Sequence, residues 1–164
     1  KDGAIMKIDL QKCASLDEFE NLQNSLPKTL KTRSNFGVID ATGGAAYYET
    51  GNYTFTRFDV NDIHDAPLGY LVRTNFSYSG DRSHDVGLSR HLAAQDLLYQ
   101  ASLTNSLSVN FLLKNVIRSL KHGLTKLDLH DFITDNSNES RFFPFRDFIP
   151  RYLTASAIVV QGVV

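Results

Sequence analysis

The stretch NFGVIDATGGAAYYETGNYTFTRFD, residues 35–59, decides the fold because short apolar runs alternate with turn residues along it. Within it, ATGG (41–44) and TGN (50–52) supply the glycine and asparagine that tight hairpins require. The segment YTFTRF repeats with the period of two that is typical of a strand. The pattern predicts adjacent antiparallel strands at 36–41, 44–50 and 53–59.

Two further segments are predicted to join this sheet. GYLVRTN begins as an apolar strand and ends in polar turn residues, which predicts a fourth strand at 69–74. ASAIVVQGVV, at 155–164, is an apolar run of β-branched residues, typical of a strand buried on both faces. We therefore expect residues 155–163 to enter the same core as a strand.

Helical patterns flank the predicted strands. Residues 2–13 are predicted to form one helix, and SLDE is a capping box with Ser15 at the N-cap and Glu18 three residues later. Pro27 stops the second helix. Two more apolar stripes predict helices in the second half, and Gly123 has the position of a C′ glycine after the last one. The stripes consist of Ala94, Leu97, Leu98 and Ala101, and of Val109, Leu112, Leu113, Val116, Ile117 and Leu120. This order of elements predicts an α+β fold with helices packed on a largely antiparallel sheet.

Length and charge narrow the classes of protein. The 164 residues suit a single domain, 1–164. With 17 basic against 18 acidic residues and no basic run, the chain is a poor candidate for binding nucleic acid. No apolar stretch approaches the roughly 20 residues that cross a bilayer. The single Cys13 cannot form an internal disulfide, so it leaves the redox compartment open.

The two ends predict that the chain is part of a longer protein. It opens with KDGAIM, without an initiator Met, and closes inside the apolar run described above. A secretory signal, if the protein has one, would lie upstream, and a periplasmic or secreted location would then follow. Localisation is otherwise open.

Several candidate sites have a plain structural alternative. The five histidines lack metal-ligand spacing. HD at 64–65 and LHD at 129–131 could each form half of an acid–base pair, but a solvated loop is favoured for both. Cys13 lacks a neighbouring base, so a small core residue is favoured over a nucleophile. RFFPFRDFIP (141–150) is read as a loop covering the core rather than a lipid contact.

Thr74 and Asn75 end the predicted fourth strand, where α/β proteins often place functional groups. An Asn amide fixed at a strand end donates two hydrogen bonds from a neutral group and can stabilise an oxyanion. An ordinary loop asparagine is the alternative.

Four motifs in order resemble a known superfamily. NFGVIDATGGAAYYET resembles the signature ADasGdaavvE of the N-terminal-nucleophile amide hydrolases. These include choloylglycine hydrolases, penicillin V acylase, acid ceramidase-like enzymes, and the isopenicillin N acyltransferase and carcinine hydrolase group. LVRTNFSYSG resembles the TN motif that follows, KCASLDEFENLQNSLP the preceding helix, and IPRYLTASAIVVQGV a later strand of bacterial members near the acyltransferases. The resemblance covers nearly the whole chain.

The resemblance implies a four-layer αββα sandwich and an autocatalytically exposed N-terminal Cys, whose own α-amino group is the base. It assigns Asn75 as oxyanion donor, with Thr74 in support. Lys1 is not the nucleophile and Cys13 lies within the helical segment, so the nucleophile is expected upstream. The family's Arg near the late strand falls close to Ala157, with Arg151 further off.

The predicted function is hydrolysis of linear, non-peptide amide bonds through an acyl-enzyme, or transfer of the acyl group to an amine. The resemblance implies a small-molecule amide substrate and no metal or organic cofactor. A partner chain carrying the nucleophile, or a homo-oligomer, is compatible with it. The alternative is a binding domain or structural subunit that keeps the scaffold and lacks catalysis.

Overall fold

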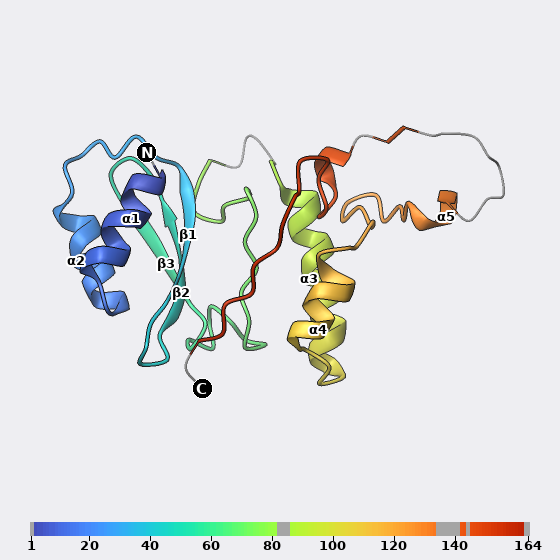
Figure 1. The fold of residues 1–164 in the computed structure, drawn as a ribbon, viewed down its shortest axis with the longest axis horizontal. Helices are drawn as coiled ribbons and strands as arrows, with labels where there is room; N and C mark the ends of the chain where they lie inside the picture. Colours follow the sequence, from blue (N-terminus) through green and yellow to red (C-terminus); the bar gives the residue numbers. More distant parts are fainter. Residues whose placement is uncertain (1, 82–85, 134–141, 144, 163–164) are drawn as a thin grey trace. The chain divides into compact units, whose positions relative to one another are not determined.

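The structure is a computed structural model that describes residues 2–81, 86–133, 142–143 and 145–162. It contains two compact units, one formed by Lys1–His84 with Val160–Val164 and the other by Asp85–Val159. The first unit combines helices with a three-stranded antiparallel sheet, and the second is helical in its regular elements (Figure 1). The chain is therefore an α+β protein, as predicted. The expectation of a single domain stays a prediction.

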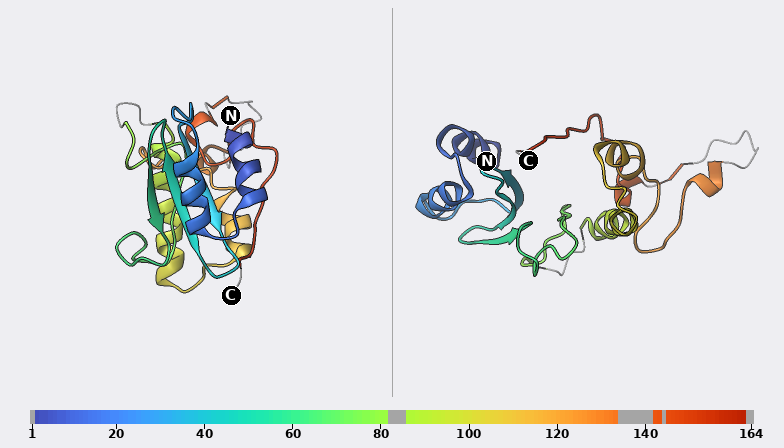
Figure 2. Two further views of the ribbon diagram at one scale, coloured as in Figure 1. Left: turned by 90° about the vertical axis from the view of Figure 1, so that its left-hand side faces the viewer. Right: turned by 90° about the horizontal axis from the view of Figure 1, so that it is seen from below.

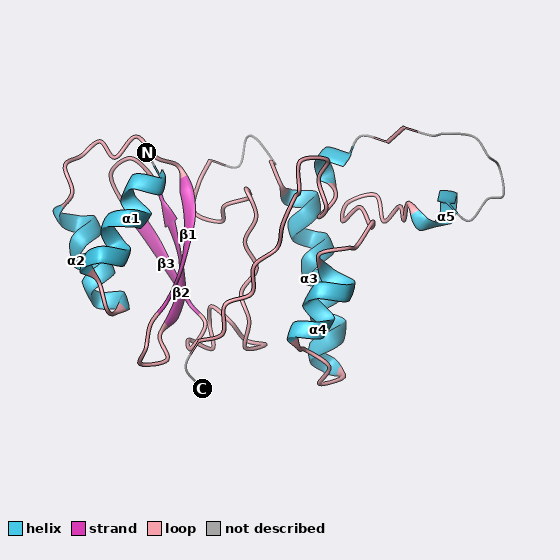
Figure 3. Cartoon of the chain, viewed as in Figure 1, coloured by secondary structure: helices cyan, strands magenta, loops and turns pink. Residues whose placement is uncertain are grey.

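The predicted hairpins are confirmed in the first unit. Strands β1 (Ser34–Ile39), β2 (Ala45–Thr50) and β3 (Phe55–Asp59) pair in the order β1-β2-β3 (Figure 3). The β1–β2 turn is closed by the backbone N–H of Asp40, which donates to the carbonyl of Gly44 at 2.9 Å. Gly43 has a φ of 91°, a left-handed conformation that favours glycine.

Helices α1 (Asp2–Lys12) and α2 (Leu16–Ser25) cover one face of this sheet (Figures 1 and 2). The rings of Phe19 and Tyr48 pack with their centroids 4.6 Å apart. The buried residues between helices and sheet form one hydrophobic core: Ile5, Leu16, Phe19, Phe36, Ala46 and Tyr48. Each of these side chains projects from a position that the helical or strand period assigns to the inner face.

The predicted capping box is present in a modified form. Ser15 is the N-cap of α2, and its hydroxyl accepts from the backbone N–H of Glu18 at 3.2 Å. The Glu18 carboxylate reaches back to the N–H of Ala14 at 2.6 Å, one residue before the cap. The two helices are thus joined at the turn that connects them.

Replacing this cap tests how much the turn contributes. We expect Ser15→Ala to lower the free energy of unfolding by about 1 kcal/mol, because one N–H of the first turn loses its acceptor. Chemical denaturation of both proteins measures the difference. Ser25→Ala, at the exposed end of the same helix, is the control, and an equal loss in both variants would contradict a capping role.

The predicted fourth strand at 69–74 is wrong, because these residues have no regular structure. They lie on the sheet face opposite the two helices, as Figure 2 shows. Side chains of the sheet satisfy the polar groups of the adjoining residues, as Asn35 does for the carbonyls of Thr74 and Phe76. Hydrogen bonds from side chains on this face of the sheet therefore hold the segment, in place of the backbone pairing with a neighbouring strand that the pattern predicted.

The predicted strand at 155–163 is also wrong over its described part. Residues 155–162 are irregular and exposed, with Ile158 at 83% and Val160 at 69% of full exposure. Apolar, β-branched composition favours a strand but supplies no partner for its backbone groups. The core that this run was expected to enter is made by other residues.

The second unit is built around α3 (Leu88–Leu103), whose predicted apolar stripe is confirmed: Ala94, Leu98 and Ala101 are buried. The predicted second helix is shorter than its pattern. It consists of α4 (Val109–Phe111) and one π-helical turn, η1 (Leu112–Val116). The remaining elements are α5 (His130–Ile133) and the 3₁₀ turn η2 (Phe145–Asp147).

Gly123 is not the C′ residue of that helix, which ends several residues before it. Its backbone packs directly on α3 instead. A Cβ at this position would lie 2.0 Å from the carbonyl oxygen of Ser89 and 2.6 Å from the backbone nitrogen of Ala93. The Gly123 N–H donates to the buried hydroxyl of Ser89 at 3.0 Å. Glycine is required here for close approach rather than for a helix cap.

The segment RFFPFRDFIP covers the core only at its C-terminal half, among the described residues. Phe148 is buried and packs on the ring of His122 at 5.5 Å, whereas Phe142 is 98% exposed. The polar segment TDNSNES (134–140), which the sequence predicts to be exposed, lies outside the described residues. No helix in the described parts of the chain is both long enough and apolar enough to span a bilayer.

Candidate functional site

Asn75 lies in the candidate loop, residues 73–79, which is connected to the sheet by side-chain hydrogen bonds. Its two neighbours are fixed by Asn35 of β1, whose Nδ2 donates to the carbonyl oxygens of Thr74 at 2.8 Å and Phe76 at 3.0 Å. The Thr74 hydroxyl accepts from the N–H of Phe76 at 3.1 Å, which closes the turn around Asn75. Asn75 itself remains exposed. The backbone on either side of this exposed residue is therefore held in place.

Glu49 of β2 holds the residues that follow. Its carboxylate accepts from the hydroxyl of Ser77 at 2.6 Å, the N–H of Tyr78 at 3.0 Å, and both the N–H and hydroxyl of Ser79 at 2.7 Å. The side chain is 2% exposed. A carboxylate surrounded by donors in this way can remain charged inside a protein.

Arg73 balances the buried charge. Its Nε lies 2.9 Å from Glu49 Oε1, and its side chain is 5% exposed. The guanidinium also lies over aromatic rings, 4.3 Å from the centroid of Phe58 and 5.0 Å from that of Tyr78. These cation–π contacts hold the start of the loop against the sheet.

Thr74 and Asn75 line a polar cavity of about 660 Å³ within the first unit. Its walls come from the start of β1, the end of β2, the β2–β3 connection and the loop itself. Seven of its lining residues carry hydroxyl groups: Thr74 and, besides it, Ser34, Thr50, Thr54, Thr56, Ser77 and Ser79. A small polar molecule could bind here through several neutral donors and acceptors.

The pKa of Glu49 shows how the loop and sheet depend on each other. Burial alone would raise this pKa, but hydrogen bonds from Ser77, Tyr78 and Ser79 outweigh burial and lower the pKa below its ordinary value of 4.5. The folded protein therefore favours the ionised form more than the unfolded chain does. The carboxylate stabilises the fold at neutral pH.

This depressed pKa predicts a loss of stability in acid. The contribution of Glu49 is fully present above its unfolded pKa, near 4.5, and is lost as the pH falls through the lower folded pKa. We expect the free energy of unfolding to fall across this window, and to fall less in Glu49→Gln, which cannot ionise. Urea titrations from pH 6 to pH 3, values chosen around that pKa, measure it; identical slopes would contradict the linkage.

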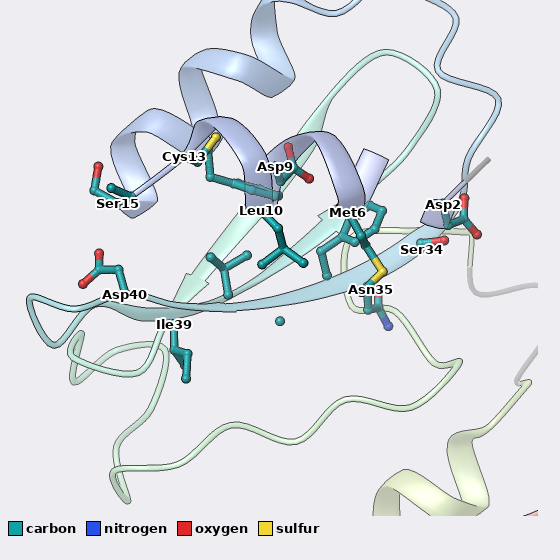
Figure 4. A pocket seen from close by; sticks show the side chains of 15 residues that line it. Asp2, Met6, Asp9, Leu10, Cys13, Ser15, Ser34, Asn35, Ile39 and Asp40 are labelled. Atoms are coloured by element: carbon teal, nitrogen blue, oxygen red, sulfur yellow. The ribbon is translucent and has the colours of Figure 1, made fainter. Parts of the chain in front are cut away.

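Cys13 lies in a different cavity, of about 430 Å³, between α1 and β1. Figure 4 shows its Sγ near Asp9 on α1, with Leu10 and Met6 further along the helix. Burial raises the pKa of the Cys13 thiol, and the carboxylates of Asp9 and Glu18 raise it further, against the weaker effect of Lys12. The thiol also packs on the hydrophobic core, so the interpretation as a small core residue is supported.

The raised pKa predicts that the Cys13 thiol is alkylated slowly. We expect iodoacetamide near neutral pH to alkylate Cys13 more slowly in the folded protein than in the urea-unfolded chain, because the thiolate fraction is lower. Intact-mass spectrometry at timed intervals measures both rates. A folded rate equal to or above the unfolded rate would show an activated thiol.

The two histidine candidates, for which a solvated loop was favoured, have different surroundings. The Nδ1 of His130 lies 3.0 Å from Oδ1 of Asp128. His64 is exposed, and Asp65 accepts from the backbone N–H of Asp59 at 2.8 Å. Among the described residues, no three His, Cys, Asp or Glu side chains group as metal ligands.

Sequence reasoning missed Asn35 and Glu49, the two residues that hold the candidate loop. Both lie on the outer face of the sheet, directly opposite each other in the β1–β2 register. An amide and a carboxylate within strands that carry mainly aromatic and aliphatic side chains were the available signal. Their hydrogen-bond partners, 28 to 41 residues away, have no signature in a local pattern.

Comparisons with known proteins do not assign this chain to a family. A scan against models of protein families, a search of curated proteins and a search of solved structures each found no match to this chain.

Proposed function

We propose that the chain belongs to an amide hydrolase of the N-terminal-nucleophile type, in which Asn75 donates to the oxyanion. The observation that supports this most directly is the Asn75 loop. An exposed amide lines a polar cavity, while Asn35 and Glu49 hold the backbone on either side of it. A donor held by its surroundings stabilises developing charge without reorganising during the reaction.

In the proposed reaction, a cysteine thiol at a chain terminus attacks the carbonyl carbon of a linear amide. Its own α-amino group takes the thiol proton and later delivers it to the leaving amine. The Asn75 amide donates to the carbonyl oxygen as that oxygen becomes negative. Collapse of the tetrahedral intermediate breaks the C–N bond and leaves a thioester, which water, or an acceptor amine, then cleaves. Thr74 supports the turn.

Cys13 does not supply this thiol, since its pKa is raised and it lies between two helices. The proposal therefore places the nucleophile in a segment outside residues 1–164, or in a partner chain. It also places the sheet of the first unit within a four-layer αββα sandwich, of which α1, α2 and this sheet would form two layers. A small-molecule amide is the expected substrate, and the mechanism uses no metal or organic cofactor.

The test is amide hydrolysis by the complete protein. N-acyl amines and N-acyl amino acids of varied chain length are supplied, amine release is measured by fluorescence, and the acyl-enzyme is sought by intact-mass spectrometry. Enzyme alkylated at the terminal cysteine is the control. Release of amine together with a thiol-borne acyl group supports the proposal. Neither product from any amide would favour the alternative, a non-catalytic domain on the same scaffold.

A further inference from the structure

The second unit contains a cavity that the proposed amide chemistry does not use. It has a volume of about 640 Å³ and lies where η1 and the turn after it approach Asp128 and His130. Lys114, Arg118 and Lys121 line it together with those two residues. All of these side chains belong to Asp85–Val159, so the cavity is complete within one compact unit.

The lining carries an excess of positive charge. Three cations face one carboxylate, Asp128, which leaves a net charge of +2 when His130 is neutral. No carboxylate among the described residues forms an ion pair with Lys114, Arg118 or Lys121. Cations gathered in one cleft repel each other and focus a positive potential, which a bound anion would relieve.

The backbone around the cavity is irregular but well hydrogen-bonded. The N–H of Ile117 donates to the carbonyl of Leu112 at 3.0 Å, the i to i+5 bond of a π-turn, and Lys114 lies within this turn. Single π-turns of this kind are rare and are frequently found at functional sites. Leu129, 1% exposed, anchors the opposite side through its N–H to the carbonyl of Leu120 at 3.1 Å.

Asp128 and His130 form an ordered pair beside the cations. Asp128 accepts from the backbone N–H of His130, and from its ring, each at 3.0 Å. Burial acts to raise the pKa of Asp128, but hydrogen bonds from the backbone and ring of His130, together with nearby positive charge that includes Lys121, outweigh burial and lower that pKa. Asp128 is therefore an anion that interacts with His130 and Lys121. The charges of Lys114 and Arg118 remain available to a ligand.

The geometry points to a binding site for a small organic phosphate, formed by Lys114, Arg118 and Lys121 with His130 at its edge. A guanidinium and two ammonium groups match a dianionic group better than a single carboxylate. A cavity of this size suits a small molecule. A polynucleotide is disfavoured, because the chain is nearly neutral and the lining has no Phe, Tyr or Trp on which bases could stack.

Titration of the complete protein with inorganic pyrophosphate by calorimetry at low salt tests this site. We expect saturable binding, weakened about tenfold by Lys114→Gln and by Arg118→Gln, since each removes one charged contact. Lys126→Gln is the matched control: Lys126 is exposed in the same unit but pairs with Asp96, away from the cavity. Circular dichroism verifies that the variants remain folded.

The outcomes separate a phosphate site from general attraction of anions. Tighter binding of pyrophosphate than of sulfate, weakened about tenfold in each of the two cavity variants and unchanged in the control, supports the site. No binding at millimolar pyrophosphate, or equal weakening by Lys126→Gln, would overturn it. Sulfate binding as tight as pyrophosphate would overturn the assignment to phosphate. If variants unfold, NMR shifts of residues 112–121 and 128–130 in the unaltered protein decide the same question.

Discussion

Glu49→Gln is expected to lower the free energy of unfolding by about 3 to 5 kcal/mol, the usual cost of breaking a buried ion pair from one side. The change leaves Arg73, 5% exposed, without its counter-charge. It also places an amide NH₂ group where the carboxylate now accepts from Ser77, Tyr78 and Ser79. At least one donor would then face another donor inside the protein, where the Glu49 side chain is 2% exposed.

Urea denaturation at neutral pH measures this loss. Asp96→Asn is the matched control, because it breaks the pair with Lys126, in which both side chains are more than 60% exposed. Exposed pairs contribute about 0 to 1 kcal/mol, so that variant should unfold almost as the unaltered protein does. Equal losses in the two variants would show that the Glu49–Arg73 pair does not hold the candidate loop on the sheet.

Asn75→Ala is expected to lower kcat for amide hydrolysis by roughly 10²–10³, about 3–4 kcal/mol of barrier, in the complete protein. The loss falls on kcat because the amide donates most strongly once charge develops on the carbonyl oxygen. KM should change little. Stability should also change little, within about 0.5 kcal/mol, since Asn75 is exposed.

Asn61→Ala is the control for this variant. Asn61 is an exposed loop asparagine of the same unit whose Nδ2 donates to the carbonyl of Gly43 at 3.2 Å, outside the polar cavity. It should leave both kcat and melting temperature near those of the unaltered enzyme. Asn35→Ala should lower kcat as well as stability, because it releases the turn that carries Asn75. A normal kcat in Asn75→Ala would remove the oxyanion role.

The strands and helices that the sequence predicted correctly are those stabilised by hydrogen bonds between residues close together in the sequence. The hairpin at Asp40 to Gly44 closes over four residues, and the Asp40 carboxylate accepts from the N–H groups of Thr42 and Gly44 inside it. The Thr42 hydroxyl, which donates to the same carboxylate at 2.7 Å, and these two N–H groups hold the pKa of Asp40 at about 2. The Ser15 cap acts over three residues. Turn chemistry and caps of this kind are visible in a short window of sequence.

The errors arose where a local pattern had two tertiary solutions. GYLVRTN has strand composition, but the polar groups that follow it find Asn35 and Glu49 rather than a neighbouring strand. The stripe from Val109 to Leu120 has helical spacing, yet the chain enters a π-turn at Leu112 and leaves the helix. Composition and periodicity measure the preference of a segment, and packing elsewhere in the unit overrides it.

By itself, the sequence determined the three strands, the cap at Ser15 and the position of Asn75 at the end of an apolar run. Only the tertiary structure decided what holds the backbone around Asn75. Asn35 and Glu49 form hydrogen bonds with residues 28 to 41 positions further along the chain. It also gathered Lys114, Arg118 and Lys121 beside Asp128. Propensity acts over a few residues, whereas a buried charge is stable only where folding brings donors from distant segments to surround it.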